Sequence, residues 1–383
     1  MTRKAKRLWF FLFLSAAAVV MIARQPTYST RWHRPSVPYH IPQPDLSRSR
    51  VQRSAHEVTR QTWWQRALCN FRNSTLHSNP SNLFHLPRLY SDITPKTTDY
   101  NIFLSDTACN ARPYYRAWCS AESWAGQNPG AEVWYILTSP AADDSDGLVQ
   151  ELKRHYENLH VVGADLDKMF SQTPLDKFFK SGNWTRNTPW PQSNLSNLLR
   201  NIVVWLWGGF YSDADTICIK NITHLHNIIA YQYYSDSFAN NALMQFEAGH
   251  QFIYMVMEYL KDNFKLDTWH VNGPGAATKV LKELCNVTDL DDVLNGTRKC
   301  EGVSLLPENM LQPIPHQMWQ FYFTKGYGYK FEEKLKSVYV LHTWNKLSEY
   351  EPIIIGRDSI YDVAARTYCP ITYSHAAFRS AFF

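Results

Sequence analysis

The stretch SNLSNLLRNIVVWLWGGFYSDADTICIK, residues 193–220, carries three consecutive signals of local structure. Apolar residues recur at three-to-four spacing over 193–207, which predicts a long helix. Gly208 and Gly209 follow directly, and glycine commonly ends a helix. The apolar run 210–220 then predicts a strand, so a helix leads directly into a strand that carries two acids.

The residues before this stretch alternate between strand and helix. Short apolar runs of strand length are separated by segments with helical spacing. In chain order we expect a strand at 99–106, a helix at 114–130, a strand at 131–139, a helix at 146–159 and a strand at 160–165. This order predicts an α/β protein with a Rossmann-like, mainly parallel sheet covered by helices on both faces.

The residues after the stretch follow a less regular pattern. We expect a strand and a helix within 241–264, a helix within 273–285 and a late strand over 337–346. The sequence therefore predicts a helical and irregular C-terminal region beside the sheet.

Asp213 and Asp215 lie one residue apart in the expected strand. Side chains at i and i+2 of a strand point to the same face, so the two carboxylates would repel each other without a cation between them. Oxygen ligands suit a hard divalent ion such as Mg²⁺ or Mn²⁺. Ligands of open parallel sheets bind beyond the carboxyl ends of the strands, where this pair is expected. The alternative is a solvated turn or a pair of helix-capping aspartates.

The N-terminal residues predict a membrane anchor. Residues 1–7 are strongly basic, and residues 8–23 run without a charge. Because basic residues stay on the cytoplasmic side, we expect a cytoplasmic tail, a transmembrane signal-anchor at 8–23 and a luminal remainder. Residues 24–62, rich in Pro, Ser and Arg, predict a flexible stem, and residues 63–383 predict a single luminal domain. A cleaved signal peptide is the alternative.

Glycosylation sequons and cysteines agree with a secretory-pathway lumen, where glycans are added and disulfides persist. Seven cysteines are present, and we interpret Cys218, inside an apolar run, as a buried free thiol. The sequons are at Asn73, Asn183, Asn194, Asn221, Asn286 and Asn295. Candidate cysteine pairs are Cys109 with Cys119, Cys285 with Cys300 and Cys69 with Cys369, but connectivity cannot be deduced from sequence.

Charge and aromatic content exclude some classes of function. The net charge of +5 comes partly from the N-terminal residues, and no helix rich in Arg or Lys argues for nucleic acid. Aromatic residues form 15% of the chain, and we interpret Trp205 and Trp207 as core. Four further tryptophans lie in segments rich in Gly, Pro and Asn, where packing and stacking on a ligand both stay open: Trp184, Trp190, Trp269 and Trp344.

Seven blocks of the sequence occur in a recognisable order. They are CSAESWAGQNPGAEVWYIL, QTPLDKFF, NLLRNIVVWLWGGFYSDAD, NNALMQFE, WHVNGPGAATKVL, LLPENMLQPIPHQMW and LHTWNK. In this order and near spacing they resemble the α-1,4-glycosyltransferase family, which includes lactosylceramide α-1,4-galactosyltransferases and insect α-1,4-N-acetylgalactosaminyltransferases. The resemblance covers roughly residues 98–375, and ordered blocks are more specific than any single motif.

The resemblance implies a type II Golgi membrane enzyme with a GT-A nucleotide-sugar fold. Such an enzyme would move galactose or N-acetylgalactosamine from a UDP-sugar, in α-1,4 linkage, onto a glycolipid acceptor, with retention at the donor carbon. Mn²⁺ or Mg²⁺ would be its cofactor, and the Golgi membrane would hold it through residues 8–23. Association with itself or with other Golgi enzymes stays open.

The resemblance also implies roles for single residues. Asp215 would ligate the metal, Asp213 would contact the ribose or a metal-bound water, and His342 would complete the metal or diphosphate site. The donor side is implied at Arg200, Asn197 and Lys346, with Arg200 on the donor sugar or diphosphate and Lys346 on the leaving UDP. Asn240 would lie beside the transferred sugar and, with Arg200 and the two aspartates, form the catalytic set. The acceptor region is implied at Trp269, Asn272, Gly273 and Pro274.

Some positions depart from the family pattern. Asn197 stands where the family usually has Asp, so donor binding would weaken or donor preference would shift. Asn194 is expected at the mouth of the site, where a glycan would block it, so we predict that this sequon is unoccupied. These departures define the alternative, a weakened or inactive relative that acts as a luminal partner of other glycosyltransferases. A secreted sugar-binding module is a third hypothesis.

Overall fold

The structure is a computed structural model that describes residues 62–69, 82–233, 236–300, 302–380 and 382–383. The predicted cytoplasmic tail, apolar anchor and most of the predicted stem lie outside the described residues, as does the Asn73 sequon. Within the described ranges, no helix is both long enough and apolar enough to cross a membrane.

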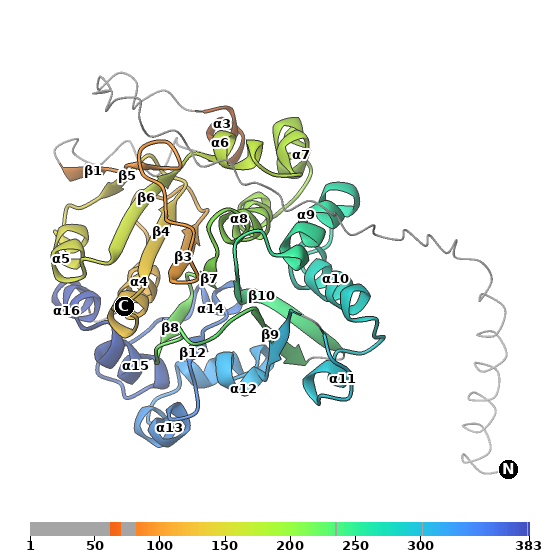
Figure 1. Cartoon of the computed structure of the whole chain (residues 1–383). Helices are drawn as coiled ribbons and strands as arrows, with labels where there is room; N and C mark the ends of the chain where they lie inside the picture. Colours follow the sequence, from red (N-terminus) through yellow and green to blue (C-terminus); the bar gives the residue numbers. More distant parts are fainter. Residues whose placement is uncertain (1–61, 70–81, 234–235, 301, 381) are drawn as a thin grey trace, which may run out of the picture. The chain divides into compact units, whose positions relative to one another are not determined.

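A mixed eight-stranded sheet forms the centre of the described part (Figure 1). Its strand order is β11-β9-β10-β7-β3-β4-β6-β2. The segment β7-β3-β4-β6-β2 is parallel, as predicted, but β10 runs antiparallel to both β7 and β9. The strands are β2 (Arg88–Leu89), β3 (Asn101–Asp106), β4 (Glu132–Leu137), β6 (Leu159–Ala164), β7 (Gly209–Asp213), β9 (Ile228–Tyr233), β10 (Ser237–Phe246) and β11 (Ser304–Leu306).

Two smaller sheets and a set of helices complete the architecture. One small sheet pairs β1 (Leu83–His85) with β5 (Ala141–Asp143), and the other pairs β8 (Thr216–Cys218) with β12 (Val340–His342). The longer helices are α4 (Tyr115–Gln127), α5 (Leu148–His155), α8 (Pro191–Trp207), α9 (Gln251–Asn263), α10 (Ala276–Cys285), α13 (Gly328–Leu335), α15 (Ile360–Tyr368) and α16 (Pro370–Arg379). The shorter ones are α3 (Trp63–Leu68), α6 (Leu166–Ser171), α7 (Asp176–Ser181), η2 (Asn183–Thr185), η3 (Val271–Gly275), α11 (Asp291–Leu294), α12 (Glu308–Leu311), η4 (His316–Tyr322) and α14 (Asn345–Ser348).

Helices pack on both faces of the sheet, because successive strand residues point to opposite sides. On β3, Phe103 joins an apolar cluster with α8, α9 and α10, whereas Ile102 and Leu104 join a cluster with α4 and α5. Figure 1 shows these two helical layers on either side of the strands. Trp205 and Trp207 are buried in the α8 cluster, which confirms their interpretation as core.

The Gly208–Gly209 pair lets α8 lead directly into β7, as the sequence predicts. Gly209 has φ of 114°, and a Cβ there would collide with the carbonyl of Asn101 on the neighbouring strand β3. A residue with a side chain would therefore be excluded by both backbone geometry and packing. Glycine at this position allows the helix and the strand to follow each other without a loop.

The single strand predicted over 210–220 is wrong, because the structure divides it into β7 and β8. β7 ends at Asp213, and β8 leaves the main sheet to pair antiparallel with β12, with Thr216 opposite His342. The apolar pattern continues through both strands, so local periodicity does not show the change of sheet. This turn decides how the two acids are presented.

Three disulfides are present among the described residues, and one predicted pair is confirmed. Cys285 is bonded to Cys300, and Cys218 is a buried free thiol as expected. The other two predicted pairs are wrong, because their four cysteines combine differently. The observed pairs are Cys69–Cys109 and Cys119–Cys369, and the second links α4 to the junction between α15 and α16.

Candidate active site

Asp213 is the last residue of β7, at the carboxyl edge of the parallel strands, opposite Ser105 of β3. Its Oδ1 atom lies 2.9 Å from Nη2 of Arg200 and accepts a hydrogen bond of 3.0 Å from the hydroxyl of Tyr211. Tyr211 precedes Asp213 by two residues in the same strand, so both side chains point the same way. α8 and β7 therefore hold one carboxylate at the edge of the sheet.

Arg200 contacts protein acceptors through its guanidinium. Nε donates to the carbonyl of Ser196, Nη2 to the hydroxyl of Ser196, and Nη1 to the carbonyl and side-chain oxygens of Asn241. The side chain is 6% exposed and also lies over the ring of Tyr211. The structure thus places Arg200 beneath Asp213, where it orients and neutralises that carboxylate.

A tight turn at Ala214 separates the two acids. Thr216 is buried, and its hydroxyl donates to the carbonyl of Asp213 at 3.0 Å. The hydroxyl of Ser212 lies 2.8 Å from the hydroxyl of Thr216. These contacts direct the chain out of the main sheet and into β8. Asp215 therefore faces the C-terminal part of the chain, while Asp213 stays with the main sheet.

The segment around β12 and α14 surrounds Asp215. Nε2 of His342 lies 3.3 Å from its carboxylate, and the backbone N–H of Asn345 donates to Oδ2 at 2.7 Å. Thr343 donates to the carbonyl oxygen of Asp215 from both its N–H and its hydroxyl, at 2.9 and 2.8 Å. Trp344, which lies between Thr343 and Asn345, has a positive φ of 55°, a conformation that costs free energy for a residue with a side chain. That bend brings residues on both sides of it onto the same aspartate.

The charges in this group compensate one another. Burial raises the pKa of Asp213 above its ordinary value, and the attraction of Arg200 opposes that rise. Burial also acts on Asp215, but the attraction of His342 and the hydrogen bonds from His342 and Asn345 outweigh it and lower the pKa. For His342, burial is outweighed by Asp215 and Asp213, so its pKa is raised. Positive charge on Arg200 and His342 thus allows the two acids to lie together.

Asp213, Asp215 and His342 are suited to hold a divalent cation. Each offers one ligand atom, and these atoms lie within 4.8 Å of one another. Nδ1 of His342 is buried without a hydrogen-bond partner among the described residues, which is uncommon for a polar atom in a folded protein. Carboxylate oxygens and an imidazole nitrogen form a set that Mn²⁺ accepts. The predicted metal site is thus assembled from β7, the following turn and β12.

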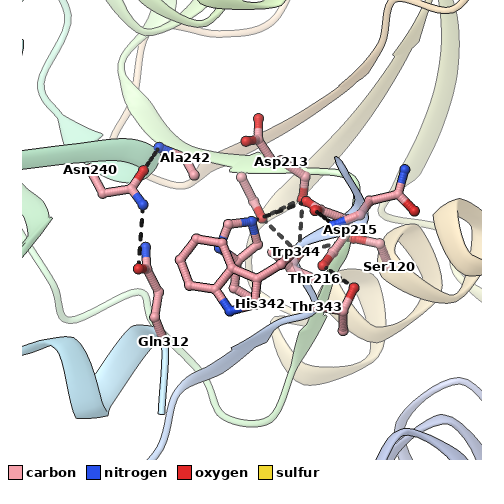
Figure 2. A network of polar contacts seen from close by, with 12 residues as sticks. Ser120, Asp213, Asp215, Thr216, Asn240, Ala242, Gln312, His342, Thr343 and Trp344 are labelled. Atoms are coloured by element: carbon pink, nitrogen blue, oxygen red, sulfur yellow. Dashed lines mark hydrogen bonds and ion pairs between the residues drawn. The ribbon is translucent and has the colours of Figure 1, made fainter. Parts of the chain in front are cut away.

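Asn240 lies on β10, across the indole of Trp344 from the acids in the view of Figure 2. Its Nδ2 donates to Oε1 of Gln232 at 2.7 Å and to Oε1 of Gln312 at 3.3 Å, and its Oδ1 accepts from the N–H of Ala242. Asn240 and Gln312 are buried, so this amide group has a fixed orientation. The structure therefore places Asn240 in a polar network of its own, separate from the contacts of the acids.

The predicted acceptor residues at η3 approach the donor-side residues on α8 and β10. A Cβ on Gly273 would lie 2.7 Å from Oδ1 of Asn197 and 3.2 Å from Oδ1 of Asn241. Because Asn241 also accepts from Arg200, the residues at 197, 200, 241 and 273 form one contiguous group. Asn272 bonds the backbone of Lys265 through both ends of its amide, which closes the intervening loop. Pro274 lies inside η3.

The tryptophans of the irregular segments differ in burial and in their contacts. Trp184 is fully buried, which identifies it as core. Trp269 is 39% exposed, meets Trp190 edge to face at 5.1 Å, and lies under Nζ of Lys346 at 5.6 Å from its ring centroid. Trp344 lies 4.2 Å from the ring of His342 and donates to the carbonyl of Ile314. Trp269 and Lys346 thus meet across two segments that are far apart in sequence.

Several residues of this site were not identified from the sequence. Tyr211 had a usable signal, since it lies two residues before Asp213 in an expected strand. Asn345 acts through its backbone N–H, which almost any residue type would supply. Gln312 accepts a hydrogen bond from Asn240, which is distant in sequence. The Asn345 contact depends on the long-range pairing of β8 with β12, which local patterns do not contain.

Comparison with known proteins identifies the family. The family description "Alpha 1,4-glycosyltransferase conserved region" matches residues 245–376, and "Glycosyltransferase sugar-binding region containing DXD motif" matches residues 115–235. The lactosylceramide 4-alpha-galactosyltransferase of Pongo pygmaeus is 30% identical over 220 residues, covering 57% of this chain and 97% of that protein. The chain belongs to the α-1,4-glycosyltransferase family. It is a glycosyltransferase, and the matched region with the DXD motif contains the Asp213–Asp215 pair.

The chain is also similar to two further relatives and to two solved structures. The human lactosylceramide 4-alpha-galactosyltransferase is 29% identical over 297 residues, covering 73% of this chain and 80% of the relative. A human alpha-1,4-N-acetylglucosaminyltransferase is 25% identical over 278 residues, covering 71% and 79%. Among solved structures, the galactosyltransferase LgtC is 10% identical with a TM-score of 0.37, covering 72% of this chain and 95% of that one. The PaToxG glycosyltransferase is 18% identical with a TM-score of 0.36, covering 49% and 70%.

Proposed function

We propose that this α-1,4-glycosyltransferase moves galactose or N-acetylgalactosamine from a UDP-sugar onto a glycolipid, with retention of configuration and with Mn²⁺ or Mg²⁺ as cofactor. The observation that carries the proposal is the convergence of Asp213, Asp215 and His342 from segments that are far apart in sequence. Its acceptor class rests on relatives whose names specify lactosylceramide. The name of a further relative adds N-acetylglucosamine as a third donor sugar to compare.

In this proposal the three residues hold the divalent cation, which would neutralise charge on the UDP diphosphate. Arg200 and Tyr211 orient Asp213, while Asn345 and Thr343 orient Asp215, so neither carboxylate has to reorganise when the donor arrives. Such preorganised charge lowers the free energy of a transition state in which the sugar–phosphate bond breaks.

Other chain residues would contact the substrates. Lys346 extends from α14 into solvent and would place its ammonium near the leaving diphosphate. Asn240 and Asn197 would face the donor sugar, and Trp269 the acceptor. Retention would follow from attack on the face that the phosphate leaves, with a departing phosphate oxygen accepting the proton of the acceptor hydroxyl.

We also propose that the enzyme is a type II protein of the Golgi membrane with its catalytic part in the lumen. The basic residues 1–7 before the apolar residues 8–23 support this orientation. The disulfides of the described part support an oxidising compartment. An N-terminal epitope tag should be digested by protease added to sealed microsomes, while residues 63–383 should be protected.

The function is tested by calorimetry of UDP binding to the purified full-length chain with and without Mn²⁺. We expect binding that requires Mn²⁺ and is lost in Asp215→Asn, because the amide removes a charged ligand atom. Asp262→Asn, which changes an exposed acid on α9, is the matched control and should bind normally. Binding that ignored both Mn²⁺ and Asp215 would contradict the proposal. Transfer from the three UDP-sugars to lactosylceramide then identifies the donor.

A further inference from the structure

Exposed apolar side chains gather on η4, α14 and the residues that follow each of them. Half of the exposed large hydrophobic residues of the described chain lie between residues 318 and 350. Met318 is 46% exposed, Phe321 37% and Leu347 48%, and exposed patches of this kind commonly mark an interaction surface. We call Met318, Phe321, Tyr327, Leu347 and Tyr350 the η4–α14 patch.

The elements of this patch lie side by side. η4 packs directly against α14. The ring of His316, at the start of η4, lies 5.7 Å from that of Trp344, which precedes α14 and donates to the carbonyl of Ile314. Phe321 meets Tyr327 edge to face at 5.5 Å. Two segments that are distant in sequence thus lie against each other, and each carries exposed apolar side chains.

The patch is joined to the candidate active site through α14. Leu347 follows Asn345 by two residues, and the N–H of Asn345 bonds the carboxylate of Asp215. A ligand that covered Leu347 would therefore lie close to the proposed metal and diphosphate groups. The neighbouring Lys346 reaches from the same short helix over the ring of Trp269, the proposed acceptor residue.

Buried side chains and hydrogen bonds hold η4 and α14 in place beneath the patch. Tyr322 and Phe323 are buried beneath η4, while the adjacent Phe321 faces outward. Arg116 of α4 donates to the carbonyl and hydroxyl of Ser348 at 2.8 and 3.1 Å and to the carbonyl of Glu351. Its guanidinium also lies over the ring of Phe323. These buried contacts allow η4 and α14 to present apolar side chains to the outside without losing their own packing.

We propose that the η4–α14 patch inserts into the surface of a lipid bilayer and so presents the active site to a membrane-embedded acceptor. This proposal rests on the proposed glycolipid acceptor, whose ceramide would keep the sugar within a few ångströms of the bilayer. Met, Phe and Leu suit the acyl boundary, and Tyr suits the headgroup layer. Lys330, which lies over the ring of Tyr327, and Lys325 would extend toward lipid phosphates.

The occupant follows from the position of the patch. A lipid-linked sugar can reach Asp215 only if the bilayer comes close to the surface beside it, and the η4–α14 patch is apolar, exposed and joined to Asp215 through α14. The apolar residues 8–23 predict that the same chain is tethered to a membrane, which raises the local concentration of lipid at this surface.

The test compares two acceptors for one enzyme. The full-length chain is reconstituted in phosphatidylcholine vesicles, and transfer from the preferred UDP-sugar is measured onto lactosylceramide in the bilayer and onto lactose in solution. We expect Phe321→Asp combined with Leu347→Asp to lower transfer to lactosylceramide about tenfold, while transfer to lactose stays within about twofold of the unmodified enzyme. Phe378→Asp, which alters a 92% exposed residue on α16, is the matched control and should change neither rate.

Each other outcome has a distinct meaning. Unchanged transfer to lactosylceramide would overturn the proposal, including when the surface instead binds a protein partner. An equal loss with both acceptors would also overturn it, because the substitutions would then act on the site itself. Absence of transfer by the unmodified enzyme with both acceptors would overturn the proposed function, and this inference with it.

Discussion

The two acids of the DXD motif are one residue apart, yet different regions of the molecule hold them. Asp213 is oriented by α8 and β7, through Arg200 and Tyr211. Asp215 is oriented by the β12–α14 segment, and its bonds to Thr343 span 128 positions of sequence. One side of the site therefore belongs to the sheet core, while the other depends on C-terminal residues that pair with it through β8.

The two sides of the site hold their carboxylates by different kinds of contact. The α8–β7 side uses a partly buried ion pair within a continuous helix and strand, so its integrity is tied to the stability of the sheet. The β12–α14 side uses backbone donors and a short helix on the surface, so its integrity is tied to local docking. Substitutions on the first side should affect folding, and those on the second should affect mainly ligand binding.

The largest effect is expected from Arg200→Met, which keeps an unbranched apolar side chain but removes the guanidinium and its charge. Asp213 would keep the hydrogen bond from Tyr211 but lose its cationic partner, and Asn241 would lose two hydrogen bonds from Nη1 of Arg200. Because the Asp213 side chain is 27% exposed, we expect a loss of about 2–4 kcal/mol in the free energy of unfolding, somewhat below that for a fully buried pair. Urea denaturation measures it.

A double substitution isolates the cause of that loss. Arg200→Met with Asp213→Asn should recover part of the free energy of unfolding, because no unpaired carboxylate remains. Lys346→Met, which removes an exposed cation, should change stability by no more than about 0.5 kcal/mol. A loss no larger than that in Arg200→Met would show that the α8–β7 side does not depend on the ion pair.

His342→Gln should act on the other side of the comparison, with a large effect on metal binding and a small one on folding. The amide oxygen is a weaker metal ligand than the imidazole nitrogen, so Mn²⁺-dependent UDP binding should weaken, by up to about 100-fold. Calorimetry of UDP with Mn²⁺ measures this, and the urea midpoint checks the fold. His224→Gln, which changes an exposed histidine near Tyr339, should leave both values unchanged. Normal metal dependence in His342→Gln would remove His342 from the site.

The same division explains what the sequence could predict. The helix over 193–207, the strands β3, β4 and β6, and the acid pair follow from periodicities of 3.6 and 2, which are local. The turn after Asp213 was missed because the apolar pattern continues through it, and β8 changes sheet by pairing with a strand far along the chain. Two of the three predicted cysteine pairs were wrong for a similar reason, since Cys119 is closer in sequence to Cys109 but is bonded to Cys369.

Arg116→Lys should have a moderate effect, confined to the β12–α14 side. A lysine keeps the charge but cannot bond Ser348 and Glu351 at once, so α14 would hold Asn345 less firmly against Asp215. We expect the KM for the UDP-sugar to rise about tenfold with kcat reduced less, and the free energy of unfolding to change by less than about 1 kcal/mol. Arg112→Lys, on an exposed guanidinium, is the control. Equal losses in kcat and stability would instead indicate general loosening of the C-terminal region.

The last prediction concerns glycosylation of Asn194, for which we expect the smallest effect. This sequon residue lies on the first turn of α8, on the α8–β7 side of the site. Nδ2 of Asn194 is the atom that a glycan would modify. It donates to the carbonyl of Trp184 and to the hydroxyl of Thr188, and Asn194 is only 4% exposed. A glycan on this atom is incompatible with the observed packing, so folded molecules should carry none, and intact glycopeptide mass spectrometry should find the site unmodified. Asn183, an exposed sequon residue eleven positions earlier, is the internal control and should be accessible to the same machinery. High occupancy at Asn194 in active enzyme would mean that the start of α8 opens, and the α8 side would then be less firmly packed than the β12–α14 side.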